Sequence, residues 1–120
     1  MAVAFDDVSS AIMDNATSVS FTSHTVAGAN RLLVVCVSFW NTGTVTDVEV
    51  DAVSITQHLL DASVQPGRAM FYQIAPGTGT HTIKVSFASA TWASVGCISF
   101  TGVDQTTPVD TAQTHSDTTS

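Results

Sequence analysis

The sequence contains very little positive charge. Its 120 residues include only three Lys or Arg against ten Asp or Glu, so the formal net charge is −7. A protein that binds a nucleic-acid backbone or an anionic membrane surface needs a basic footprint. Arg31, Arg68 and Lys84 cannot supply one, and we therefore expect neither nucleic acid nor membrane as a partner.

Targeting segments and enzyme motifs are also missing from the sequence. No apolar run approaches the roughly 20 residues that span a bilayer. The first ten residues lack the basic start and apolar stretch of a secretory signal, so we expect the chain to stay where it is made or to leave by a route other than signal-directed secretion. No GxSxG, P-loop or GxGxxG occurs. The sequence therefore predicts a protein that is not an enzyme, with no catalytic residue and no cofactor.

Candidate metal ligands are present but poorly arranged. The four histidines, which show no HxH or HExxH pairing, are expected at the surface or at strand edges: His24, His58, His81 and His115. Asp47, Glu49 and Asp51 alternate along one strand and so project from one face. Such a row binds calcium when a loop adds further oxygens, and otherwise forms a solvated acidic face that protects a sheet edge. We expect the acidic face and no metal.

Short apolar segments separated by turns dominate the chain. Charged residues make up only 11%, and polarity comes instead from Ser and Thr, which suit twisted sheets. Strand-length segments at this spacing predict an all-β fold, an antiparallel β-sandwich of immunoglobulin-like or jelly-roll type. We expect the sandwich domain to cover residues 1–104. A polar, Thr-rich C-terminal tail, residues 105–120, is expected to contact neighbouring subunits, with the interface residues Val109, Thr111, Gln113 and His115.

Period-2 alternation in three segments predicts which side chains form the core. The expected core residues are Leu33, Val35, Val37, Phe39, Ile83, Val85, Phe87, Ile98 and Phe100.

The two cysteines head matching tetrapeptides, CVSF at 36–39 and CISF at 97–100. Matching alternation would place both on the serine side of their strands, away from the phenylalanines. Their separation is similar to that of the inter-sheet disulfide of antibody-type domains. The other interpretations are free thiols that pack and a catalytic or metal-binding pair. We expect Cys36 and Cys97 to be free and mostly buried, because the side assignment and the missing signal both disfavour a disulfide.

Two tryptophans lie beside turns, and one tyrosine lies in a strand. Trp40, Trp92 and Tyr72 are therefore candidate contacts for a sugar or a protein partner, since aromatic rings near loop ends suit stacking on sugar rings. The alternative is that these rings fill the core or an interface.

Several stretches together resemble a known family. They are VAFD, NRLLVVCVSFW, FYQIAPGTGTHTIKVSF and CISFTGVDQTTP, spread over residues 3–108. The chain resembles a β-sandwich module of phage structural (decoration or fibre) proteins and of prokaryotic surface proteins. The resemblance implies no catalytic residues, and it implies that small residues usually occupy the two cysteine positions.

Two functions follow as expectations. The first is a structural protein of a virion, a phage capsid decoration (cement) or fibre subunit, made in the host cytoplasm. Its partners would be further copies of itself, the major capsid protein or another virion protein. The alternative is a carbohydrate-binding or adhesive module of an extracellular or cell-surface protein, with a glycan as partner.

Overall fold

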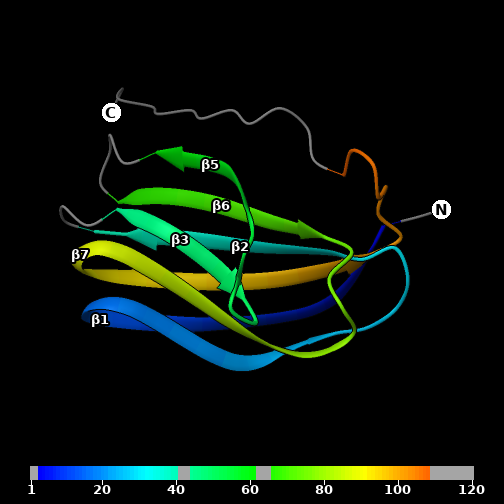
Figure 1. Cartoon of the computed structure of the whole chain (residues 1–120), viewed down its shortest axis with the longest axis horizontal. Coiled ribbons are helices and arrows are strands. Elements are labelled where there is room, and N and C mark those ends of the chain that lie inside the picture. The colour runs from blue at the N-terminus through cyan, green and yellow to red at the C-terminus, as the bar shows by residue number, and fades with distance from the viewer. Residues whose placement is uncertain (1–2, 41–43, 62–65, 109–120) are drawn as a thin grey trace, which may run out of the picture.

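The computed structural model describes residues 3–40, 44–61 and 66–108, and every regular element in these ranges is a β-strand (Figure 1). The strands are β1 (Ala4–Val26), β2 (Leu32–Phe39), β3 (Val45–Val50), β4 (Val53–Ser54), β5 (Thr56–Asp61), β6 (Gly67–Ile74) and β7 (Gly79–Thr101). Over the ranges described, no helix is long and apolar enough to cross a membrane. The all-β prediction is confirmed.

All strand pairs are antiparallel and belong to one sheet. The order is β4-β3-β7-β2-β6-β5, and β1 pairs with β7 along its whole length. Both long strands turn back at the same end of the molecule (Figure 1). In β1 the bend lies at Asn15, whose φ of 51° is compatible with the left-handed conformation that Asn tolerates. Segments that read as separate short strands in the sequence are therefore continuous.

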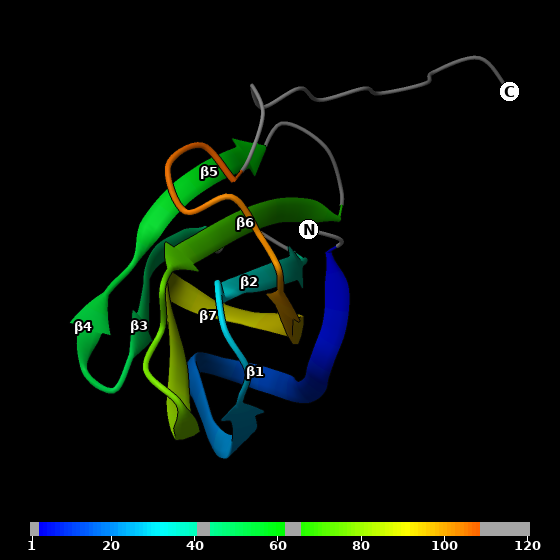
Figure 2. The same ribbon diagram turned by 90° about the vertical axis from the view of Figure 1, so that its right-hand side faces the viewer.

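The two bends fold the sheet into two halves that face each other, which nearly closes it into a barrel (Figure 2). We call the first the wide half: β1 residues 4–13, β7 residues 93–101, β2, β6 and β5. The second, the narrow half, contains β1 residues 18–26, β7 residues 79–87, β3 and β4. The core lies between the two halves.

The core contains most of the side chains expected there. Those confirmed as buried are Leu33, Val35, Val37, Phe39, Ile83, Val85 and Phe87. Phe39 and Phe87 pack edge to face across the core, with ring centroids 6.0 Å apart. Valines of β3 and Phe71 of β6 complete the cluster.

The inward face of the last strand was predicted wrongly. Val95, Cys97 and Ser99 point into the core, whereas Ile98 and Phe100 lie half-buried on the outer face. The prediction treated CVSF and CISF as equivalent, with both cysteines on the same side of the sheet. In the antiparallel pair of β2 and β7, however, Cys97 lies opposite Val35 and Cys36 lies opposite Gly96, so the two cysteines point to opposite faces. Both sides of this strand are apolar, so alternation alone could not choose between them.

This pairing also decides the cysteine question. Cys97 is buried in the core, while Cys36 is exposed on the opposite face of the sheet, next to Gly96. Side chains on opposite faces cannot meet, and both cysteines are free thiols. The expectation of free thiols is confirmed, and the expectation that Cys36 is buried is wrong. Burial raises the pKa of the Cys97 thiol to about 12, which makes it unreactive at neutral pH.

Arg31 joins the loops at one end of the sheet. Its guanidinium donates to the carbonyl of Pro76 at 2.6 Å and to that of Gly28 at 2.8 Å. Its own carbonyl accepts from the side-chain amide of Gln105 at 3.1 Å. The first residues after β7, with Val103 buried, are therefore held against the sheet.

Candidate interaction surface

The outer face of the narrow half has the composition of a solvent-exposed surface. Its exposed side chains are polar or charged: Ser18, Ser20, Thr22, Thr80 and Lys84. Cross-strand partners have the same character, since Ser20 and Glu49 both lie opposite Lys84. A sheet with one face on the core and one in water shows this polar alternation.

The outer face of the wide half is mainly apolar instead, with Ser10, Ser38, Ser94 and Arg68 among its outward side chains. On β1 the side chains of Phe5, Val8 and Ile12 are 60%, 59% and 84% exposed. Phe5 lies opposite Phe100, and Val8 lies opposite Ile98. We define the apolar face by these outward side chains: Phe5, Val8, Ile12, Val34, Cys36, Leu59, Met70, Tyr72, Trp92, Ile98, Phe100 and Trp40.

A contiguous apolar face is more informative than single exposed hydrophobic residues, which are common on all proteins. The strands β2 and β7 are apolar on both sides, a pattern typical of strands that are covered on both faces. Among the residues that the structure describes, only the inner face of these strands is covered. This surface was not predicted, because Ile98 and Phe100 were assigned to the core. The run LLVVCVSFW, which is apolar on both sides apart from Ser38, was the signal that could have revealed it.

The outer face of the wide half carries few charged groups among the described residues. Arg68 of β6 pairs with Asp61 of β5 at 3.3 Å. Asp14 lies at the bend of β1, directly after the residues 4–13 that belong to the wide half. Among the described residues, the charged side chain that reaches the middle of the apolar face is Arg68, and it is paired with Asp61.

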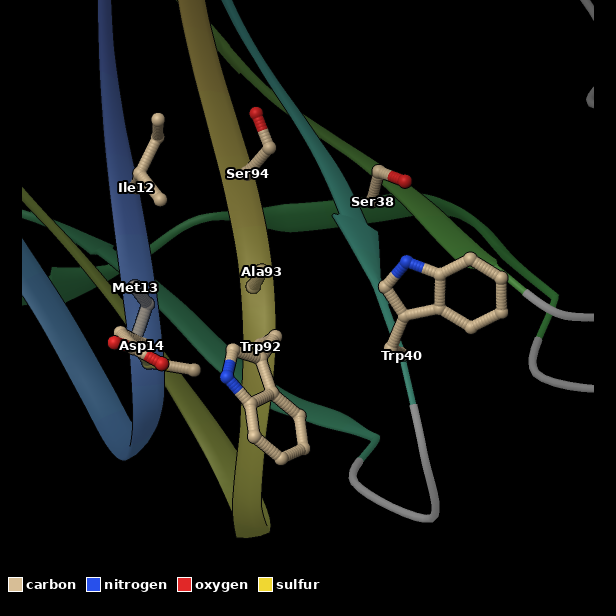
Figure 3. A pocket seen from close by; sticks show the side chains of 8 residues that line it. All are labelled: Ile12, Met13, Asp14, Ser38, Trp40, Trp92, Ala93 and Ser94. Atoms are coloured by element: carbon tan, nitrogen blue, oxygen red, sulfur yellow. The ribbon is translucent and has the colours of Figure 1, made fainter.

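The two tryptophans lie side by side at the end of the apolar face next to the bends (Figure 3). The backbone N–H of Trp40 donates to the carbonyl of Trp92 at 2.9 Å, and the buried Thr91 hydroxyl donates to the carbonyl of Trp40. The indole rings are 51% and 45% exposed and point away from each other. With Ile12, Asp14, Ser38 and Ser94 they border a groove of about 330 Å³.

The remaining predicted contact residues do not join this groove. Tyr72 shares the apolar face but lies opposite Val34 of β2. Val34 and Trp40 are six residues apart, which corresponds to about 20 Å at 3.4 Å per residue, so Tyr72 is far from the groove. Its ring packs edge to face on His58, with centroids 5.8 Å apart. The predicted tail contacts Val109, Thr111, Gln113 and His115 lie outside the described residues.

Two histidines expected at the surface are buried instead. His24 is fully buried and joins the two halves of the sheet: its Nε2 lies 3.0 Å from the Ser99 hydroxyl and its Nδ1 lies 2.8 Å from the Ser9 hydroxyl. Ser99 donates its only proton to the Asp6 carboxylate at 2.8 Å. His24 must therefore donate from Nε2 to Ser99, and in the neutral ring Nδ1 accepts from the Ser9 hydroxyl. Desolvation by burial lowers the pKa of His24, in agreement with that form, although nearby carboxylates partly oppose the effect.

His81 has the opposite charge state. Its Nδ1 lies 2.6 Å from Oδ2 of Asp51, and its Nε2 lies 2.6 Å from the carbonyl of Gly77. Neither partner can donate, because a carbonyl only accepts and the pKa of Asp51 is lowered, chiefly by the backbone N–H of Thr82 and then by His81. Burial opposes protonation of His81, but the hydrogen bonds to Asp51 and Gly77 outweigh it and raise its pKa. The histidines were misplaced because hydrogen-bond partners from distant segments compensate their burial.

The carboxylate row is occupied by contacts within the chain. Asp47 accepts from the Ser54 hydroxyl at 2.9 Å, and Asp51 binds His81. In the described ranges, no three His, Cys, Asp or Glu side chains are grouped to hold a metal ion.

The Asp51–His81 pair makes stability depend on pH in a defined direction. The raised pKa of His81 contributes stability that is complete below the unfolded value of 6.5 and is lost as pH rises through the folded value. The lowered pKa of Asp51 contributes stability above 3.8 that is lost as pH falls through its folded value. We expect Asp51→Asn to lower the free energy of unfolding by about 0.5–1 kcal/mol near pH 5.5, because Asp51 is largely exposed.

Urea unfolding of both proteins near pH 5.5 and near pH 9 measures this difference. Taking the difference between variant and wild type cancels the contribution of His24, whose lowered pKa destabilises the fold as pH falls below 6.5. The deficit of Asp51→Asn should shrink at the higher pH, because less of His81 is protonated there. An equal deficit at both values would mean that His81 carries no charge in the folded protein.

Comparison with protein-family models, with curated proteins and with solved structures gives no match for this chain.

Proposed function

We propose that the protein is a non-enzymatic structural subunit that functions by docking its apolar face on another protein. The observation that carries the proposal is the contrast between the two outer faces of one sheet, polar on the narrow half and apolar on the wide half. A face of this composition favours burial in an assembly. The sequence resemblance to phage structural modules makes a virion the proposed location, with the protein as a decoration or fibre subunit.

The same proposal includes the finer type of fold. We class the folded sheet as an antiparallel β-sandwich whose two layers are the wide and narrow halves. The core side chains between the halves support this assignment, because inner faces that interdigitate are the defining feature of a sandwich. An immunoglobulin-like or jelly-roll arrangement is the type that the resemblance implies.

A second candidate function is glycan binding at the tryptophan groove. Its support is the pair of exposed indoles with Ser38, Ser94 and Asp14 beside them (Figure 3). Indole faces stack on sugar rings, and hydroxyl and carboxylate groups bind sugar hydroxyls. This candidate requires the groove to stay open to solvent.

Density-gradient fractions of particles from cultures that encode the chain test the first function. We expect quantitative mass spectrometry to find the protein in the particle fractions at a copy number comparable with that of a coat protein. A soluble enzyme of the same lysate is the control for carry-over. Absence from the particles, together with glycan-array binding that Trp92→Ala abolishes, would replace this proposal with the glycan-binding candidate.

A further inference from the structure

We infer that the apolar face binds a second copy of this chain, with the two wide halves packed face to face about a two-fold axis. This inference rests on the proposed function, because it names the first partner of the assembly subunit. It is carried by the charge, the size and the shape of the apolar face.

Charge favours an identical copy over a charged partner. Two chains of formal charge −7 repel each other unless they meet where carboxylates are absent. The apolar face is such a place: Asp61 at its edge is paired with Arg68, and Asp14 lies at its end. A strongly basic or acidic partner would meet only the Arg68–Asp61 pair beside the middle of this face, whereas a second apolar face would meet apolar side chains like its own.

The size of the face fits a stable dimer. Five strands at about 4.8 Å spacing extend about 24 Å, and the seven steps from Phe5 to Ile12 extend about 24 Å along β1. With its protruding side chains, a surface of that extent approaches the roughly 800 Å² that each partner buries in a stable complex. Two twisted sheets also stack readily face to face, about 10 Å apart.

The centre of the face is hollow. Cys36 lies on β2, the middle strand of the wide half, and Gly96 lies directly opposite it on β7. Cys36, Gly96, Leu59 and Met70 border a depression of about 380 Å³, which Ser38, Ser94 and Arg68 also line. A Cβ added at Gly96 would have no atom within 4 Å, so the chain itself leaves this space open for side chains of another molecule.

Two-fold symmetry predicts where Cys36 lies in the dimer. A two-fold axis that stacks the face on its own copy maps the middle of the face onto itself. Cys36 of one chain must then lie close to Cys36 of the other. Cys97 faces the core and stays remote from the interface.

Sedimentation velocity of the full chain over a micromolar concentration series tests the dimer. We expect a concentration-dependent dimer whose dissociation constant rises at least about tenfold in Gly96→Arg. The thermal midpoint of a dilute, monomeric sample of this variant should be unchanged, because the added side chain enters open space. Val53→Arg is the matched control: Val53 is 61% exposed on β4, outside the apolar face, and this variant should dimerise like wild type.

Cross-linking with a short bismaleimide tests the symmetry independently. We expect one covalent dimer on a denaturing gel, lost in Cys36→Ser and retained in Cys97→Ser. Although Cys36 is exposed, partial desolvation raises its pKa, so the reaction is best run at about pH 8. A dimer that forms no Cys36 cross-link would contradict the face-to-face arrangement.

The remaining outcomes separate this inference from the proposed function. A wild-type chain that stays monomeric at every concentration overturns the dimer. If deletion of residues 109–120 then makes it dimerise, the tail covers the face instead. If the wild-type chain is monomeric but enters particles, and Gly96→Arg does not enter them, the structural function holds. The apolar face then binds another virion protein. If the chain dimerises but is absent from particles, the inferred dimer holds and the proposed virion location is wrong.

Discussion

Replacing Phe39 with alanine is expected to lower the free energy of unfolding by about 3–5 kcal/mol. The Phe39 ring is 1% exposed and lies in the middle of the core, edge to face on Phe87. Removing it deletes the apolar contacts of a fully buried ring and leaves a cavity between the two halves of the sheet. Equilibrium urea unfolding, compared at constant m-value, measures the loss.

The neighbouring residue provides the control. Trp40 is larger than Phe39 but half exposed on the outer face, so Trp40→Ala should cost much less stability in a dilute, monomeric sample. A loss below about 1 kcal/mol for Phe39→Ala would show that the inward face of β2 is assigned wrongly.

Gly67 extends the same test. A Cβ at Gly67 would lie 2.4 Å from Cε2 of Phe39, because the ring packs directly on the glycine backbone. Gly67→Ala should therefore cost about 1–3 kcal/mol in the wild type through overpacking. In the Phe39→Ala background the same change should cost far less, since the ring that it meets is gone.

Replacing Ser99 with alanine is expected to cost about 1–3 kcal/mol, although the side chain is small. Ser99 accepts the proton of His24 Nε2 and donates to Asp6, and both Ser99 and His24 are fully buried. Without the hydroxyl, the Nε2–H of His24 has no partner and cannot reach water. Chemical denaturation near pH 8 measures the cost while His24 is neutral.

Ser94→Ala is the matched control for this change. Ser94 lies on the same strand but is exposed on the outer face, and its loss should change stability by no more than about 0.5 kcal/mol. If both alanine variants were equally stable, the chain of hydrogen bonds from Ser9 to Asp6 would not stabilise the fold.

The sequence by itself determined the fold class and most of the core. Strict alternation in RLLVVCVSFW and THTIKVSFA placed Leu33, Val35 and Phe39 inside correctly, because in a strand every second side chain must share a face. The scarcity of charge and the abundance of Ser and Thr predicted the all-β class. These properties are local, and each is readable from a few consecutive residues.

Only the tertiary structure decided the pairing register and its consequences. The tetrapeptides CVSF and CISF are alike, yet Cys36 pairs with Gly96 and Cys97 pairs with Val35. This register puts Cys97 inside and Cys36 outside. His24 and His81 are buried because partners far along the chain, Ser99 and Asp51, satisfy their ring nitrogens. The apolar face exists because the bends of β1 and β7 bring one side of each strand onto the core and leave the other side outward. Register, long-range hydrogen bonds and the choice between two apolar sides depend on which strands meet, and alternation within one strand carries no information about its neighbours.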